Sequence, residues 1–129
     1  MPSHDPLTAP MKGAEHREVA GVHIDMTRVG HARVRRVIYP TGFRWSTSMK
    51  PIVNTDRCEH AHVGFIVSGS IGIEYADGCK ETFTAPQAVS IAPGHEGWVI
   101  GNAPAVMIEV DFEGETAERF GLREHRHSS

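Results

Sequence analysis

Short hydrophobic segments alternate with polar residues along most of the chain, and Gly, Pro, Asn or Asp interrupts them about every ten residues. Side chains that alternate with a period of two lie on opposite faces of a strand, and closely spaced turns are typical of a β-sandwich or β-barrel. The pattern therefore predicts an all-β fold. In chain order, the expected strands are residues 19–26, 31–39, 43–47, 62–67, 71–75, 81–84, 88–92, 98–100 and 105–112.

The length of 129 residues fits a single domain. Asp77-Gly78 separates two of the expected strands and indicates a hairpin turn, because both residues tolerate a positive φ. We expect a loose, proline-containing N-terminal arm over residues 1–17 and a barrel over residues 18–113. Residues 114–129 form the expected C-terminal tail, with one or two helical turns over residues 115–120.

Potential metal ligands occur at every second position just before the strand that is expected at residues 62–67. They are Asp56, Cys58, His60 and His62. If the backbone is extended there, these four side chains share one face. Carboxylate, thiolate and imidazole groups bind Zn²⁺, Fe²⁺, Cu and Ni. The spacing therefore predicts a metal site inside a small β-barrel.

Composition gives no sign of a nucleic-acid or membrane partner. The net charge is −3 at pH 7, and no hydrophobic run approaches the roughly 20 residues of a spanning helix. The first residues lack the pattern of a signal peptide, so we expect a cytoplasmic protein in which Cys58 and Cys79 are reduced. Arg33, Arg35 and Arg36 crowd one strand, and we interpret them as a solvated face rather than an anion site.

The metal-ligand segment resembles part of the cupin superfamily, whose members are small jelly-roll barrels with a metal site in the mouth. The first cupin block reads His-x-His, three or four residues, Glu, six residues, Gly. Counting back from Gly69 places His62 at the glutamate position. The shortest family spacing then places Asp56 and Cys58 at the two histidine positions, with His60 as an extra imidazole. In this register the resemblance implies that Asp56, Cys58 and His62 are ligands.

A second register remains open. It uses His60 and His62 as the histidine pair, and it finds Phe65 or Ile66 where the family has glutamate. This register contains no carboxylate, and it brings Gly69 closer to the histidine pair than the family spacing does.

The second cupin block reads Gly, five residues, Pro-x-Gly-x-x-His, three residues, Asn. Residues 85–95 resemble it imperfectly, because His95 falls two or three residues early. A closer resemblance is to a group of bacterial cupins of unassigned function, and it implies that Cys58, His62 and His95 belong to a common site. The segments that carry this resemblance are residues 42–46, 50–52, 56–58, 62–69 and 93–98.

Further side chains are candidates for the chemistry of the site. Glu109 and Asp111 share one face of the last expected strand. Glu109 would act as a general base or orient a ligand histidine, and the alternative is a solvent-exposed position. Arg44, Trp45 and Trp98 are candidates to line a substrate pocket, with Arg44 holding an acid group; packing and surface charge are the alternative roles.

Three functions are compatible with these residues. The first is a metal-dependent oxygenase, isomerase or lyase that acts on a small organic molecule. The second is a non-catalytic module that binds or senses a small ligand or metal, and the third is a barrel that has lost its metal site. A Cys- and His-containing site favours Zn or Fe, while Ni, Cu and Mn remain compatible. The family resemblance also implies a homodimer.

Overall fold

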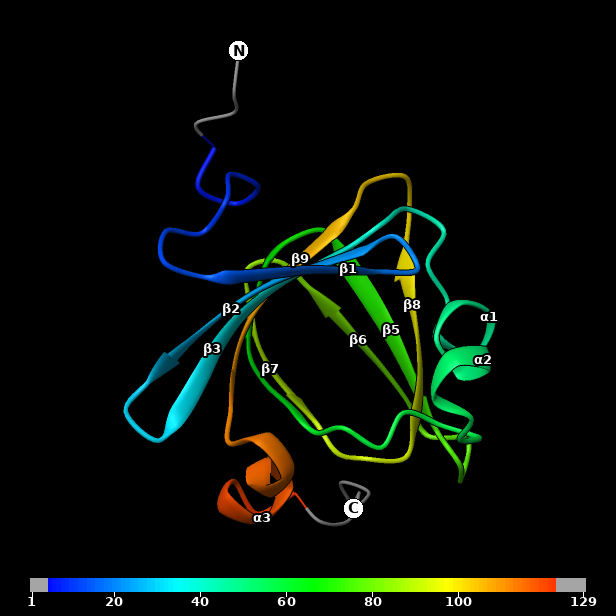
Figure 1. Cartoon of the computed structure of the whole chain (residues 1–129). Coiled ribbons are helices and arrows are strands. Elements are labelled where there is room, and N and C mark those ends of the chain that lie inside the picture. Colours follow the sequence, from blue (N-terminus) through cyan, green and yellow to red (C-terminus); the bar gives the residue numbers. More distant parts are fainter. Residues whose placement is uncertain (1–4, 123–129) are drawn as a thin grey trace.

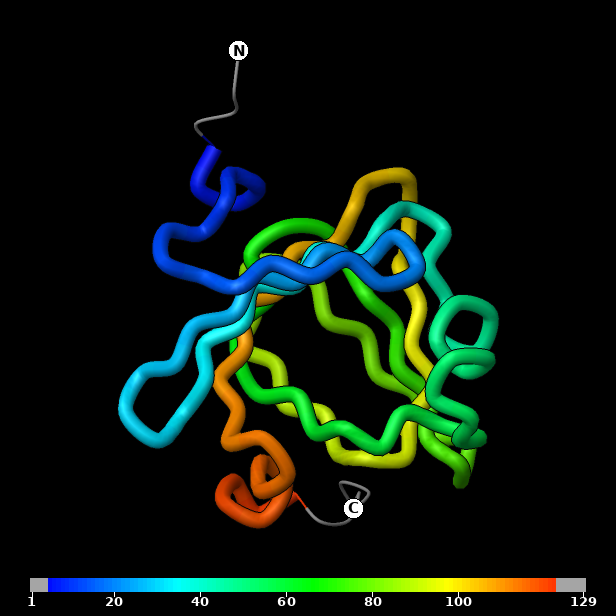
Figure 2. The backbone as a smooth tube through the Cα atoms, viewed as in Figure 1, coloured from blue at the N-terminus to red at the C-terminus, as the bar shows by residue number. Residues whose placement is uncertain are grey.

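Two antiparallel β-sheets face each other in the computed structural model, which describes residues 5–122 (Figure 1). The tube view shows the backbone of both sheets curving around a common interior (Figure 2). The larger sheet has six strands, in the order β1 (Glu15–Val19), β2 (Val22–Val29), β3 (Ala32–Tyr39), β9 (Ala105–Asp111), β4 (His62–Ser68) and β7 (Gln87–Ile91). The smaller sheet has the order β6 (Lys80–Thr84), β5 (Ser70–Tyr75) and β8 (His95–Ile100). This arrangement confirms the predicted jelly-roll fold.

The interior is built from the side chains that alternate inward along these strands. Val37 and Met107 lie opposite each other on β3 and β9, and both are almost fully buried. Ile66 on β4 and Ile91 on β7 join them in the same core. Because β9 lies between β3 and β4, its inward-facing residues contact both neighbouring strands. This central position of β9 matters for the site described below.

Short helices occupy the connections outside the sheets. Helices α1 (Trp45–Ser48) and α2 (Lys50–Val53) lie beside one side of the barrel, whereas η1 (Glu113–Glu115) and α3 (Thr116–Arg119) follow β9 (Figure 1). The helical turns expected after the barrel are therefore present. The described residues contain no helix that could span a bilayer.

The prediction of a strand at residues 43–47 was wrong. The aromatic and β-branched residues of this segment favour a strand, but Trp45 begins helix α1 and its side chain is buried in the core. The Ser46 amide donates a hydrogen bond to Glu96 Oε1 at 3.0 Å, which ties the first turn of the helix to β8. Tertiary packing therefore overrides the local preference.

The expected strand at residues 19–26 is a hairpin. Ala20 and Gly21 have φ values of 50° and 81°, so the chain reverses there between β1 and β2. Strand β1 begins at Glu15, within the segment that the sequence predicts to be an arm. Residues 1–4 and 123–129 of the expected arm and tail lie outside the described residues.

The three arginines of β3 do not form a solvated face. Arg33 and Arg35 lie on the same face as Val37 and both pair with Asp111. Arg36 lies on the opposite face, where its side chain is buried and pairs with Asp25. The interpretation as a solvated face treated the three residues as a group, whereas strand alternation separates Arg36 from the other two.

Asp25 connects the N-terminal segment, through Met11 and His16, to the outer face of the six-stranded sheet. Its buried carboxylate accepts a hydrogen bond from the Met11 amide at 2.7 Å and pairs with His16 and Arg36. Burial alone would raise the pKa of Asp25. The hydrogen bonds from Met11 and His16 and the charge of Arg36 outweigh burial and lower this pKa.

We expect Asp25→Asn to lower the free energy of unfolding at pH 7 by about 2 kcal/mol, because charge-assisted hydrogen bonds are lost. A carboxylate whose pKa is lowered on folding stabilises the protein above its unfolded value of about 4, and this contribution disappears as the pH falls through the lower folded value. Urea titrations at pH 7 and pH 3 should therefore show a smaller acid-induced loss of stability in the variant than in the wild type. Asp56→Asn, at an exposed position, is the control and should behave like the wild type.

Candidate metal centre

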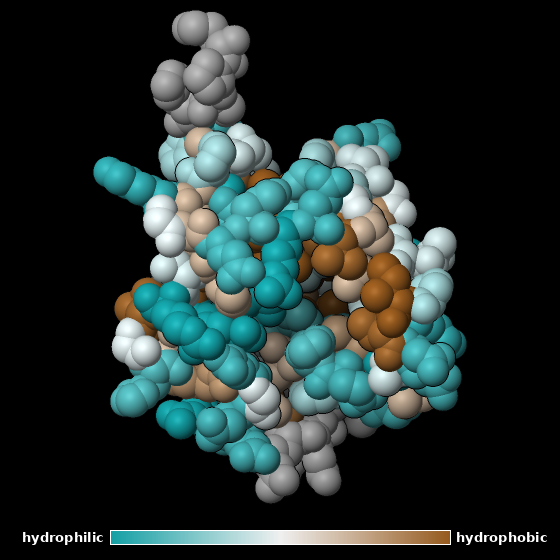
Figure 3. Space-filling view, viewed as in Figure 1, coloured by the Kyte–Doolittle hydropathy of each residue, from teal (hydrophilic) through white to brown (hydrophobic). Residues whose placement is uncertain are grey.

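The space between the two sheets contains a cavity of about 350 Å³. Its lining is mainly apolar, with Tyr39, Phe43 and Ile73 among the contributors. In the space-filling view this face of the molecule is hollowed near its centre, with hydrophobic side chains bordering the hollow on the side of α1 and α2 (Figure 3). A cavity of this size falls at the lower end of the range that accommodates small organic ligands.

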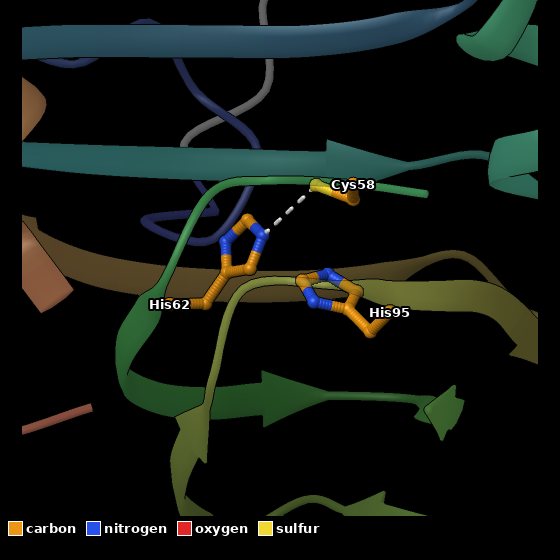
Figure 4. Close-up of side chains that lie close together, drawn as sticks. All are labelled: Cys58, His62 and His95. Atoms are coloured by element: carbon orange, nitrogen blue, oxygen red, sulfur yellow. Dashed lines mark hydrogen bonds between the residues drawn. The ribbon is translucent and has the colours of Figure 1, made fainter. Parts of the chain in front are cut away.

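Three potential metal ligands meet at the wall of this cavity. They are Cys58, His62 and His95, and one donor atom from each lies within 4.8 Å of the other two. Cys58 and His95 are buried and His62 is partly buried. In the close-up, the His62 ring is turned toward Cys58, which lies on the loop before β4, and the His95 ring lies beside the His62 ring (Figure 4). The ring centroids of His62 and His95 are 5.2 Å apart.

Backbone hydrogen bonds explain why Cys58 and His95 lie together although they are distant in sequence. The Cys58 amide donates to the His95 carbonyl at 2.8 Å, and the His95 amide donates to the Cys58 carbonyl at 3.2 Å. These bonds form an isolated antiparallel bridge, which places Cys58 directly beside the first residue of β8. His62 completes the cluster as the first residue of β4.

Hydrogen bonds behind the two histidines direct the same ring atom toward the cluster. His62 Nδ1 lies 2.6 Å from Glu109 Oε1, and His95 Nδ1 lies 2.8 Å from the Ala92 carbonyl oxygen. The Ala92 amide in turn donates to the Tyr75 hydroxyl at 3.0 Å. Both Nδ1–H groups are thereby engaged as donors, which leaves Nε2 of each ring for a ligand. This second hydrogen bond is the arrangement that orients metal-binding histidines in proteins.

Glu109 is 1% exposed, and its Oε2 has no hydrogen-bond partner among the described residues. Burial would raise its pKa, but the charge of His62, the hydrogen bond with that ring and the charge of Arg35 lower it. Glu109 is therefore an ionised group that holds His62. The structure excludes the solvent-exposed alternative for this residue.

The charges of Cys58 and His62 depend on each other. Burial would raise the pKa of Cys58, but hydrogen bonds and positive charge from His62 and His95 lower it to about 5. Burial would lower the pKa of His62, but Glu109 and Cys58 raise it to about 10. Cys58 Sγ lies 3.8 Å from His62 Nε2. Without a metal, the pair is thus a thiolate beside an imidazolium.

The donor set fits a zinc-like ion. Ligand atoms around a tetrahedral zinc lie about 3.3–3.7 Å apart, given Zn–N and Zn–S bonds of about 2.0–2.3 Å. The Sγ to Nε2 distance of 3.8 Å between Cys58 and His62 is close to this spacing. One sulfur and two nitrogen donors also suit Zn and Fe better than Mg or Ca. The cluster could therefore hold a transition metal with three protein ligands.

Asp56 and His60 are outside the cluster. The Asp56 side chain is 97% exposed and lies 3.7 Å from Lys50, whereas His60 is exposed and lines the cavity. The expectation that four alternating residues share one face was wrong, because residues 54–61 form no continuous strand and pair only at Cys58. His95 takes the third place in the cluster, in agreement with the resemblance to the bacterial group.

The three candidate pocket residues separate into two groups. Trp45 and Trp98 line the cavity. Arg44 does not, because its side chain is 49% exposed and its guanidinium carbon lies 4.9 Å from the Trp98 ring centroid. Arg44 also pairs with Glu96 at 3.8 Å. Arg35, which was expected on a solvated face, lines the cavity instead.

No protein-family model matches this sequence, and no curated protein matches it. Solved structures do resemble the fold. A Cupin 2 conserved barrel domain protein from Salinispora arenicola aligns with a TM-score of 0.55 and 16% identity over 89% of this chain and 95% of that chain. KdgF from Halomonas sp. aligns with a TM-score of 0.51 and 18% identity over 74% and 83% of the two chains.

An RmlC-like cupin from Shewanella frigidimarina gives a TM-score of 0.50 and 16% identity, over 76% of this chain and 82% of that chain. These similarities, together with the sheet order, show that the chain has the cupin fold. The fold that the sequence resemblance implied is therefore confirmed. Because all three identities are low, they carry no activity over to this chain.

Proposed function

We propose that this cupin-fold protein is a metal-dependent enzyme that acts on a small organic molecule, of the oxygenase, isomerase or lyase type. The observation that carries the proposal is the convergence of Cys58, His62 and His95 at the wall of an apolar cavity of about 350 Å³. A metal held by three side chains keeps a coordination position for water or substrate. The cavity then supplies space for the organic part of that substrate.

Each residue of the site has a defined task in this proposal. Cys58 supplies the sulfur donor, and His62 and His95 supply their Nε2 atoms. Glu109 acts as a positioning residue that holds the His62 ring and its proton on Nδ1. These three residues would hold the metal, for which the donor set favours Zn and then Fe, and a metal held there would supply Lewis-acid chemistry to the substrate. Trp45 and Trp98 would contact the substrate and exclude water.

Elemental analysis of protein purified without an affinity tag tests the proposal. We expect about one zinc or iron per chain in the wild type. Cys58→Ser and His62→Ala each remove one of three donors and should lower metal affinity by more than about 100-fold, which exceeds the effect expected for a residue that only orients a ligand. Added zinc should raise the melting temperature of metal-depleted wild type but not of these variants.

Cys79→Ser is the matched control, because Cys79 is the other free cysteine and lies outside the cluster. This variant should keep its metal and its response to zinc. A wild type that binds no metal and melts at the same temperature as Cys58→Ser with and without zinc would contradict the proposal. Turnover of a panel of small organic acids by the loaded protein would distinguish an enzyme from a metal-binding module.

A second candidate function is metal-free thiol chemistry, and the order Cys58–His62–Glu109 favours it. A nucleophile, a base and a residue that orients the base follow one another here, as in cysteine-dependent enzymes. Iodoacetamide labelling of metal-free protein measures the reactivity of the thiol. Alkylation of Cys58 more than about 10-fold faster than Cys79 at pH 7, in protein that binds no zinc, would favour this candidate.

The proposed partners are a small-molecule substrate and a second copy of the chain. The homodimer stays a prediction, which a light-scattering mass measures. We also propose a cytoplasmic location, because a reducing compartment keeps Cys58 available as a ligand or nucleophile.

A further inference from the structure

Arg35 lies where two cavities meet. It lines the main cavity that contains the metal cluster, and it also lines a second cavity of about 220 Å³. The charged residues that line the second cavity beside Arg35 are Arg17, Arg33 and the single carboxylate Glu15. Arg35 therefore stands between the apolar interior and an outer space whose lining carries more positive than negative charge.

Arg35 is paired less closely than Arg33 at this junction. Asp111 binds Arg33 through two hydrogen bonds, at 2.6 and 3.0 Å, and accepts a single longer bond of 3.2 Å from Arg35 Nη1. One carboxylate thus serves two guanidinium groups. Glu109 lies opposite Arg35 in the strand register, and the charge of Arg35 helps to lower its pKa, but its hydrogen bond is with His62 and none is made with Arg35.

The guanidinium group of Arg35 has N–H donors that make no hydrogen bond within the described residues. The bond from Nη1 to Asp111 is its one hydrogen bond among residues 5–122. The side chain is 19% exposed, so solvent reaches it weakly and an ion pair there is screened less than at the surface. The carboxylate that lines the same cavity, Glu59, is exposed. Arg35 is also the one arginine or lysine of the described residues that lines the main cavity.

We propose that the main cavity binds a small organic carboxylate with an apolar body, and that Arg35 holds its carboxylate group. This inference rests on the proposed function, because it names the class of molecule that the cavity takes. A guanidinium matches a carboxylate through two parallel N–H···O bonds, which fixes the orientation as well as the charge. The apolar body would lie against side chains such as Ile24 and Tyr39.

Register places this anion site next to the metal centre. Arg35 on β3 lies opposite Glu109 on β9, and Glu109 contacts His62. A carboxylate bound by Arg35 would therefore lie near the cluster. Arg44, the acid-binding residue expected from the sequence, is engaged outside the cavity by Trp98 and Glu96 and does not compete for this role.

Ligand titration of the full chain tests this inference, with the quenching of Trp45 and Trp98 fluorescence as the signal. The probes are phenylacetate and its neutral analogue phenylacetamide, which differ at the group that Arg35 would hold. We expect the wild type to bind phenylacetate at least about 10-fold more tightly than the amide, since a charge-assisted hydrogen bond contributes enough to produce this ratio. Arg35→Met should abolish the preference by weakening phenylacetate alone.

Two further variants keep the outcome interpretable. Arg44→Met removes an arginine outside the cavity and should bind both probes like the wild type. Arg35→Lys preserves the charge but not the planar fork, so it should retain part of the preference. Equal binding of the two probes by the wild type, no binding of phenylacetate, or a folded Arg35→Met that keeps the preference would each overturn the inference.

The zinc content and circular dichroism of each variant are measured in parallel. We expect Arg35→Met to hold as much zinc as the wild type, because Arg35 makes no hydrogen bond or ion pair with the three proposed ligands. Loss of the carboxylate preference with zinc retained supports the inference. A wild type that binds phenylacetate but no zinc would contradict the metal proposal and leave the carboxylate site supported.

Discussion

Gly64→Ala should destabilise the protein by about 4 kcal/mol or more, which is the largest loss of stability that we expect from a single substitution in this chain. A Cβ at Gly64 would lie 1.9 Å from the Ile108 carbonyl oxygen and 2.8 Å from the Glu109 Cα. Both are backbone atoms of the neighbouring strand, so rotation of a side chain cannot relieve the overlap. Strands β4 and β9 would have to separate at the place where Gly64 lies opposite Glu109.

Urea unfolding of wild type and variant measures this effect. Gly114→Ala is the control, because no atom lies within 4 Å of the added Cβ and the backbone there does not require a positive φ. The control should change the free energy of unfolding by less than about 0.5 kcal/mol. A Gly64→Ala protein that is as stable as the control would show that β4 and β9 do not approach as closely as described.

Glu109→Gln should weaken zinc binding by about 10- to 100-fold, which is the range for a residue that orients a ligand histidine. Glutamine keeps the shape and can still accept the hydrogen bond from His62 Nδ1. It removes the negative charge that makes His62 Nε2 a stronger metal ligand. The same charge also keeps the proton of the ring on Nδ1. Competition with a chromophoric zinc chelator gives the two affinities directly.

Glu115→Gln provides the matched control, since that exposed carboxylate pairs with Arg119 and lies outside the cluster. Its zinc affinity should equal that of the wild type. Thermal melting of metal-free Glu109→Gln separates a positioning role from a general loss of stability. An affinity within about twofold of the wild type would contradict the role that we assign to Glu109.

The alternating pattern was sufficient to predict most of the barrel, because it depends on which side chains face the interior. It failed at residues 43–47, where the packing of Trp45 in the core and the bond from Ser46 to Glu96 decide the conformation. Those contacts join residues that are distant in sequence. The pattern of residues that are adjacent in sequence therefore cannot predict these contacts.

The candidate site was predictable in part. Cys58 and His62 are close in sequence, and both take part in the cluster. His95 entered through the family resemblance, because the bridge that carries it to Cys58 is a long-range contact. Asp56 and His60 were grouped with them on the assumption of an extended strand, which residues 54–61 do not form.

Arg35 was missed for a different reason. The same alternation that places Val37 and Tyr39 inside also places Arg35 there, and this signal was available in the sequence. The density of arginines in the strand favoured a solvated face. The number of arginines indicated a solvated face, whereas the alternation of side chains placed Arg35 inside. The ion pair with Asp111 on the neighbouring strand decides in favour of the inside position.

The cluster draws its donors from both halves of the barrel, since His62 begins a strand of the large sheet and His95 begins a strand of the small one. An ion bound there would link the two sheets directly. Oxidation of the Cys58 sulfur would take away one of its three attachments. The contribution of the bound ion to the stability of the fold would then be lost.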